Sequence, residues 1–356
     1  MSHVPETTDE IAAVGEDSAD ATGPAGAARA AGAAHAAGAG SPTVRARRPA
    51  PVALALAVAL GIGAISATQS RVNGELGRRL DDGFIAAALS FGSGLLILAV
   101  ALALSPVGRR GIGRVRTALR EQRLPFSYLL GGCAGALFAL SQTLTAAVLG
   151  IASFTIAGVA GQMLAGLLID RTGYAADFKR TLSGQRVLGA TLVLAAVVWA
   201  VSSQVRTEIP EWMLILPFLA GLGTGWQQAV NGRVRVVADS ALTATFTSFA
   251  AGTIVLVAAV LIRALFADWP SGFPAEPWLY SGGLLGCILI GASAALVRTT
   301  GVLLMGLGII SGQLVSALVI DLFWPTEGSQ LSVITVLAVG VSLIGVTVAS
   351  LRRRTL

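Results

Sequence analysis

The chain has 356 residues, of which 54% are hydrophobic and 12% charged, and its mean hydropathy is +0.76. These values lie far from those of soluble domains and indicate an integral membrane protein. Soluble enzymes and DNA-binding modules are thereby excluded. The net charge of +6 comes from loop arginines, with Lys179 as the only lysine. It therefore indicates membrane topology and contact with anionic lipids, and requires no nucleic-acid partner.

The first 50 residues are acidic at the start and then rich in alanine and glycine. The run AGAARAAGAAHAAGAG has no bulky apolar side chain to bury, so residues 1–50 are predicted to be a disordered cytoplasmic tail. The apolar stretch that begins near Pro51 is long enough to span a bilayer. We expect it to stay in the protein as the first helix.

Ten apolar stretches follow the tail, each about 20 residues long, which is the length of a transmembrane helix. They fall at 52–74, 83–105, 127–149, 151–170, 187–204, 212–231, 241–265, 278–297, 300–321 and 331–351. Short loops join them, except for the basic segment Arg109–Arg123 and the stretch Arg171–Arg186. The sequence therefore predicts an all-α integral membrane protein with ten transmembrane helices.

The basic residues predict the orientation of these helices. From Arg45 onward, the side of the N-terminus has 19 arginines and lysines and the opposite side has 5. Because basic loops stay in the cytoplasm, both termini are predicted to be cytoplasmic.

The second half of the chain repeats the first. Gln69, Asn73 and Gly74 recur 158 positions later as Gln227, Asn231 and Gly232, and Ser90, Phe91 and Gly94 recur at the same separation as Ser248, Phe249 and Gly252. Beyond the basic segment the separation is 151, where Gly131, Gly132 and Gly135 match Gly282, Gly283 and Gly286. GQMLAGLLID, which ends at Asp170, likewise matches GQLVSALVID, which ends at Asp321.

The repeats cover residues 51–205 and 206–356, with five predicted helices in each. Because five is odd, the second repeat enters the membrane from the opposite face, and the two repeats are inverted. Inverted repeats are the usual build of secondary transporters, with the substrate site at the repeat interface. The sequence thus predicts two inverted five-helix repeats around a transport site.

Three motifs occur in each repeat: Q-x3-N-G on the first helix, S-F-x2-G on the second and G-Q-x7-D on the fourth. With them, the chain from Pro51 to Arg352 resembles the YdcZ-like branch of the drug/metabolite transporter (DMT) superfamily. The resemblance implies a bacterial inner-membrane permease of ten helices that exports small molecules. Its partners would be a small-molecule substrate and the lipid bilayer, and no cofactor is implied.

The amides of the first helix in each repeat are the leading candidates for substrate binding. Gln69 and Asn73 are four residues apart, as are Gln227 and Asn231, so each pair lies on one helix face. The two pairs could meet at the centre and bind a neutral or zwitterionic solute. Alternatively, each pair only bridges neighbouring helices.

Further polar residues could line the same pathway. Gln162 and Gln313 each follow a glycine in the middle of a predicted helix, and Trp226 precedes Gln227. Ser90 and Ser248 are candidates for gating, although each hydroxyl could instead bond a carbonyl one turn back.

Asp170 and Asp321 occupy equivalent helix ends. Inverted topology places Asp170 at the cytoplasmic end and Asp321 at the outer face, so their carboxylates are not expected to meet. Each is an interfacial anchor or the acid of a gate. Glu75 is expected near the end of the first helix, beyond Asn73.

Other functions remain as alternatives. A non-transporting scaffold or a lipid scramblase would use the same helices, and self-association is left open. An intramembrane hydrolase is disfavoured because both histidines, His3 and His35, lie in the tail. Cys133 and Cys287 match no metal or disulfide spacing and are interpreted as packing residues.

Overall fold

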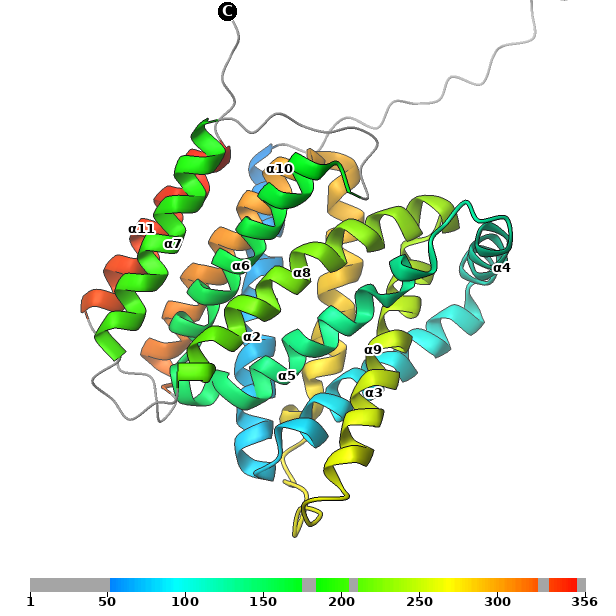
Figure 1. Cartoon of the computed structure of the whole chain (residues 1–356), viewed down its shortest axis with the longest axis horizontal. Coiled ribbons are helices and arrows are strands. Elements are labelled where there is room, and N and C mark those ends of the chain that lie inside the picture. Colours follow the sequence, from blue (N-terminus) through cyan, green and yellow to red (C-terminus); the bar gives the residue numbers. More distant parts are fainter. Residues whose placement is uncertain (1–51, 175–183, 205–210, 326–332, 351–356) are drawn as a thin grey trace, which may run out of the picture. The chain divides into compact units, whose positions relative to one another are not determined.

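The computed structural model describes residues 52–174, 184–204, 211–325 and 333–350, and every regular element within these ranges is a helix (Figure 1). The predicted tail at 1–50 and Lys179 lie outside the described residues. The prediction of an all-helical fold is therefore confirmed.

The helices lie in chain order in the two parts of the chain that the sequence predicts as repeats. The first part contains α2 (Val52–Leu80), α3 (Gly83–Leu104), α4 (Pro106–Arg120), the 3-10 helix η2 (Phe126–Leu130), α5 (Gly131–Leu149), α6 (Ile151–Thr172) and α7 (Gly184–Gln204). The second part contains α8 (Glu211–Ala238), α9 (Ala241–Arg263), the 3-10 helix η3 (Pro277–Ser281), α10 (Gly282–Phe323) and α11 (Val333–Ser350). Asp82 and Ser240 start α3 and α9 by accepting the backbone N–H three residues on, at 3.0 and 3.1 Å.

Helix α4 corrects the prediction that the basic segment Arg109–Arg123 is a loop. Ser105 caps the helix by accepting the N–H of Gly108 at 3.1 Å, and Pro106 occupies its first turn. Its buried residues are spaced three and four apart: Gly108, Gly111, Val115 and Ala118. This is the spacing of an amphipathic helix, which the many arginines concealed.

Helix α10 joins the predicted helices 278–297 and 300–321 into one element. Leu289 and Ala292 from its first half and Ile309 from its second half pack in one cluster with Ala59 and Ile62 of α2. A straight helix would separate residues 289 and 309 by about 30 Å, so α10 bends back on itself between them. The bend lies between Ala292 and Ile309, a stretch that includes the predicted turn and contains no proline to end the helix. The gold and orange parts of α10 accordingly run in different directions (Figure 1).

Helix α2 continues past its predicted end at residue 74 to Leu80. Glu75 supports the extra turn, because its carboxylate accepts hydrogen bonds from Arg78 and Arg79, three and four residues on, at 2.7 Å each. Glu75 therefore lies in the second-last turn of α2 and is buried.

The two helices α3 and α9, which are equivalent in the repeats, run antiparallel to one another. At one end, Asp82 before α3 pairs with Arg263 at the end of α9, at 2.7 Å. At the other end, Thr243 at the start of α9 donates to the carbonyl of Gly108, just after α3, at 2.9 Å. Between them the rings of Phe91 and Phe249 stack with centroids 4.8 Å apart.

Ion pairs also join the connections at the two ends of the helices. Arg114, between the second and third predicted spans, pairs at 3.1 Å with Asp239, between the sixth and seventh. At the opposite end, Arg79 pairs with Glu276, which lies between the seventh and eighth. Helices α7 and α11 lie side by side (Figure 1).

Four helical segments in the described part of the chain are long and apolar enough to cross a membrane. They are Gly83–Leu104, Phe126–Leu149, Ile151–Ile169 and Ala241–Arg263. Large apolar side chains of α3 and α9, such as Leu96, Leu104 and Ile254, are exposed. In a bilayer these side chains face lipid.

Candidate functional site

The amides of α2 form a buried hydrogen-bonded network. Asn73 donates through Nδ2 to Oε1 of Gln142 on α5 at 2.8 Å, and Gln142 donates in turn to Oγ of Ser70 at 2.8 Å. Gln69 donates through Nε2 to the carbonyl of Gly282 at 2.9 Å. Asn73, Gln142 and Ser70 are all buried. The network thus joins α2 to α5 on one side and to the start of α10 on the other.

The amides of α8 are arranged differently. Gln227 and Asn231 both donate to Oγ of Ser248 on α9, at 3.0 and 3.2 Å. Ser248 is buried, whereas the two amides are partly exposed. Among the described residues, no hydrogen bond joins this pair to Gln69 and Asn73. The structure therefore does not bring the two pairs together.

Glycines form the opposing surface for both pairs. A Cβ added at Gly135 would lie 2.5 Å from Nε2 of Gln227, and one added at Gly286 would lie 2.8 Å from Nε2 of Gln69. A Cβ at Gly282 would collide with Oδ1 of Asn73, a buried atom with no hydrogen-bond partner in the structure. Bare backbone therefore lets the amides approach the facing helix closely.

The second helices meet the same glycine stretches through backbone atoms. A Cβ at Gly132 would collide with the carbonyl of Ser248, and one at Gly283 would collide with that of Ser90. Ser90 is buried at this crossing. Since Gly132 and Ser248 correspond to Gly283 and Ser90 at separations of 151 and 158, equivalent residues make equivalent contacts.

Gln162 and Gln313 lie where the first helix of one predicted repeat crosses the fourth helix of the other. A Cβ at Gly63 would lie 2.5 Å from the backbone nitrogen of Gln313, and one at Gly225 would lie 3.2 Å from the carbonyl of Gln162. Gln313 is buried and Gln162 is partly exposed. Trp226, which follows Gly225, is also partly exposed.

Asp321 caps a helix of the other half of the chain. Its two carboxylate oxygens accept the backbone N–H groups of Ile151 at 2.9 Å and Ala152 at 2.7 Å, at the start of α6. Gly150 precedes this start with φ 79°, a conformation that favours glycine. Asp321 is 3% exposed, so the carboxylate lies inside the protein. The side chain of Asp170 lies outside the described residues.

Gln142 was missed by the sequence analysis. It lies within the predicted span 127–149, and the residue 151 positions later is Ser293, which is also polar. Extending the repeat alignment to this position would have identified a recurring polar site. The side chain of Ser293 lies outside the described residues.

A charged cluster at the end of α2 was also missed. The buried carboxylate of Glu75 accepts hydrogen bonds from Arg71 at 3.1 Å and from Arg78 and Arg79 at 2.7 Å. The Arg71 guanidinium lies 5.0 Å from the ring centroid of Trp324. The residue equivalent to Glu75 is Arg233, so comparing the repeats could not have revealed this cluster.

Arg79 extends the cluster to the segment before η3. It pairs with Glu276 and lies 5.7 Å from the ring centroid of Trp278. Hydrogen bonds from its own backbone amide and from Arg79 hold the pKa of the Glu276 carboxyl below its usual range. This end of α2 is thus tied to the loop that precedes α10.

The two repeats differ at one pair of equivalent glycines. Gly74 on α2 faces α5, where a Cβ would lie 3.1 Å from Cβ of Ala146 and from N of Ala147. Gly232, the equivalent residue on α8, is exposed, and among the described residues no atom lies within 4 Å of that position. The seam between α2 and α5 is therefore closed, whereas α8 is not packed at the matching place.

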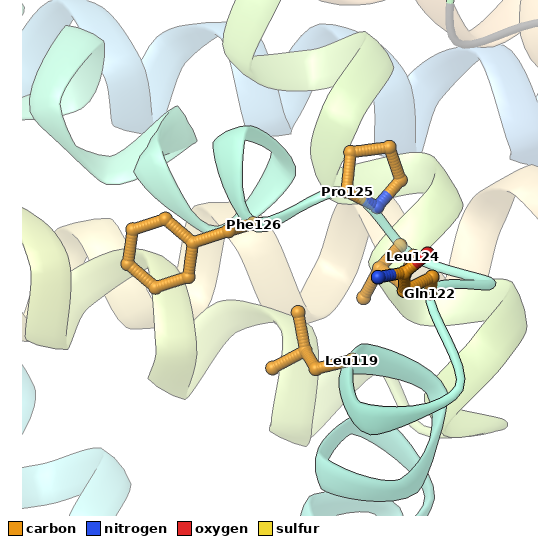
Figure 2. Close-up of a pocket in the computed structure, with 5 residues that line it drawn as sticks. All are labelled: Leu119, Gln122, Leu124, Pro125 and Phe126. Atoms are coloured by element: carbon orange, nitrogen blue, oxygen red, sulfur yellow. The ribbon is translucent and has the colours of Figure 1, made fainter.

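A separate pocket lies between the end of α4 and the start of η2, with a volume of about 490 Å³ (Figure 2). Leu119, Gln122, Leu124, Pro125 and Phe126 line it. None of these residues belongs to the amide pairs or contacts them in the described structure. Within the described residues, no cluster of three potential metal ligands is found.

Comparison with known proteins identifies relatives by sequence and by fold. The family model described as "Putative inner membrane exporter, YdcZ" matches residues 54–199 and again residues 212–348. No curated protein sequence matches the chain. A solved structure described as "Crystal structure of protein" aligns with a TM-score of 0.50 and 17% identity, covering 84% of this chain and 96% of its own. At that identity, the likeness shows the fold alone.

Proposed function

Because the chain belongs to the YdcZ family of inner membrane exporters, we propose that it is a secondary transporter which exports small molecules across the bacterial inner membrane. It does so by alternating access between two inverted five-helix repeats. Both termini are cytoplasmic in this proposal, following the excess of basic residues on their side.

One observation supports the proposal above all: the contacts between the two halves obey the sequence repeat. The amide Gln69 of α2 faces Gly286 of α10, while the amide Gln227 of α8 faces Gly135 of α5. The antiparallel course of α3 and α9 is what inversion requires. The family model also matches the chain once in each half.

The proposed substrate is neutral or zwitterionic. The side chains that surround the two amide pairs, away from the ion pairs at the helix ends, are amides, hydroxyls and the stacked rings of Phe91 and Phe249. None of these groups is ionised, and a binding site without fixed charge favours a solute with balanced charge that forms hydrogen bonds. Of the two amide pairs, Gln227 and Asn231 are the better candidates for binding, because both are partly exposed, whereas Asn73 of the first pair is buried.

Alternating access is supported by the difference between Gly74 and Gly232. In a transporter of two inverted repeats, one side is closed while the equivalent side is open. The closed seam between α2 and α5 lies on the predicted outer side, where Asn73 and Gln142 bond across it at 2.8 Å. The unpacked position on α8 lies toward the predicted cytoplasmic side, so the structure would correspond to a cytoplasm-facing state.

The test is a thermal-unfolding screen of the detergent-purified protein against amino acids, sugars, nucleosides, polyamines and lipophilic cations. A ligand that binds the folded state raises the unfolding temperature by mass action. We expect a neutral or zwitterionic compound to raise it for the wild type, and the shift to disappear in Gln227→Ala.

The matched control is Gln228→Ala, because Gln228 is the next residue on α8 and is exposed. It should keep the ligand-induced shift. A hit should then be transported into everted vesicles at a rate that falls at least tenfold in Gln227→Ala. The proposed site is wrong if both variants respond like the wild type, and the transport proposal is wrong if a bound ligand is never moved.

A further inference from the structure

Helix α4 has two faces of opposite character. Gly108, Gly111, Val115 and Ala118 are buried, and Val115 and Ala118 pack in a cluster with Val234 and Ala238 of α8. Its five arginines are all exposed: Arg109, Arg110, Arg114, Arg116 and Arg120. Three of them, Arg109, Arg116 and Arg120, are spaced seven and four apart, so they share one stripe of the helix. We name the five exposed side chains the arginine face.

Most of the arginine face has no protein carboxylate to neutralise it. Arg114 pairs with Asp239, and Arg109 donates to the carbonyl of Ala103. Across the described residues, no salt bridge or hydrogen bond is found for the side chains of Arg110, Arg116 and Arg120. Three positive charges of the arginine face are therefore available to an external anion.

The place of α4 in the chain puts this face at the surface of the bilayer. Helix α3 is a candidate membrane span that ends at Leu104, and α4 begins two residues later. Leu96, Val100 and Leu104 of α3 are exposed apolar side chains, and Val107 at the start of α4 is 55% exposed. The basic helix thus begins at the depth where the lipid-facing apolar surface ends, which is the layer of lipid headgroups.

We propose that the arginine face of α4 is a binding site for anionic phospholipids. Guanidinium groups pair with phosphate through two parallel hydrogen bonds, and the apolar side chains of α3 below them fit acyl chains. A free phosphate compound lacks those chains. The occupant is therefore an intact anionic lipid of the adjacent leaflet, not a soluble phosphate.

A bound lipid would also hold the turn between α8 and α9 in place. Thr243 of α9 donates to the carbonyl of Gly108 at 2.9 Å, and Arg114 donates to the carbonyl of Ala238 at 3.1 Å. Through these bonds α4 is fixed to the turn. Anionic lipid should therefore raise the resistance of the protein to thermal unfolding, independently of any transported solute.

The experiment titrates dioleoylphosphatidylglycerol or dioleoylphosphatidylcholine into the detergent-purified full chain and follows the midpoint of thermal unfolding. Native mass spectrometry counts the phospholipids that stay bound. We expect the midpoint to rise with phosphatidylglycerol only. Each arginine near an anionic surface strengthens binding by about fivefold at low salt. The triple variant R110Q/R116Q/R120Q should therefore weaken apparent affinity by at least tenfold, while R110K/R116K/R120K retains most of it.

Several outcomes would overturn the proposal. Equal shifts with phosphatidylcholine would show that charge is not recognised. A full shift with glycerol 3-phosphate would show that the site takes a soluble phosphate. An unchanged preference for phosphatidylglycerol in the glutamine variant would place the lipid site elsewhere. If the triple glutamine variant fails to fold, the single variants R110Q, R116Q and R120Q decide the question, because each should weaken the apparent affinity about fivefold. None of these readouts requires a transported solute, so they do not depend on the proposed function.

Discussion

At the scale of single residues, the interface between the two halves depends on glycines that have no room for a side chain. A Cβ at Gly132 would collide with the carbonyl of Ser248 and lie 2.8 Å from the backbone nitrogen of Gly252. Backbone atoms cannot turn aside as a flexible side chain can. Helices α5 and α9 must therefore separate if this glycine is replaced.

We predict that Gly132→Ala lowers the free energy of unfolding by about 1–3 kcal/mol, the usual effect of overpacking. The measurement is the midpoint of thermal unfolding in detergent. Gly92→Ala is the matched control, because Gly92 on α3 has no atom within 4 Å of the added Cβ. Alanine favours helix over glycine, so the control should be as stable as the wild type or more so. Equal destabilisation by both substitutions would contradict this account.

At the scale of elements, α6 begins on a carboxylate from the other half of the chain. The two N–H groups at its start are bonded to Asp321, whose negative charge also favours the positive end of the helix dipole. This capping explains why a buried acid is retained at the end of α10. It gives Asp321 a structural role that the sequence left open between an anchor and a gate.

Asp321→Asn should therefore destabilise the protein by about 2 kcal/mol, because the new NH2 group faces a backbone donor and the charge is lost. Asp239→Asn is the comparison, since Asp239 has an exposed carboxylate paired only with Arg114 and Asn tolerates its φ of 49°. An exposed pair contributes at most about 1 kcal/mol. Unfolding midpoints that fall equally in the two variants would refute the capping role.

At the scale of the whole molecule, the two halves share their contacts but differ in how far they are closed. Gly74 is buried in the seam with α5, and Gly232 at the equivalent place on α8 is exposed. Asn73 of the first amide pair is correspondingly buried in the network with Gln142. In the described part of the chain, the second pair is bonded to Ser248. This difference is the form that one state of an alternating-access cycle would take.

The chain has two cysteines, Cys133 and Cys287, so a background with both replaced by alanine is practical for labelling. In it, we expect Gly232→Cys to react with a membrane-impermeant maleimide and Gly74→Cys to be at least tenfold slower. Labelling at 232 should require everted vesicles, because that end of α8 is predicted to be cytoplasmic. Labelling of the cysteine at 232 in intact cells would show that this end of α8 faces the outside, contrary to the predicted orientation. Equal labelling rates at positions 74 and 232 would contradict the proposal that the seam between α2 and α5 is closed while the matching position on α8 is open.

The sequence by itself determined the membrane class, the repeat and the family, because these depend on composition and on polar residues recurring at fixed separations. Matching polar residues such as Asn73 and Asn231 are informative wherever they lie in space. The sequence could not show that Asn73 bonds Gln142 or that Asp321 caps α6, since these contacts join residues at least 69 positions apart. In α4, the many arginines also concealed the helical spacing of the residues that become buried.

Only the tertiary structure distinguished two halves that the sequence presents as equivalent. Gln69 and Gln227 occupy matching positions and have the same chemistry, yet one bonds a backbone carbonyl of α10 and the other a hydroxyl of α9. A repeat in sequence fixes which residues correspond, and it leaves free how tightly each copy closes on its neighbours. Closure depends on packing between distant helices, so only the folded arrangement decides it.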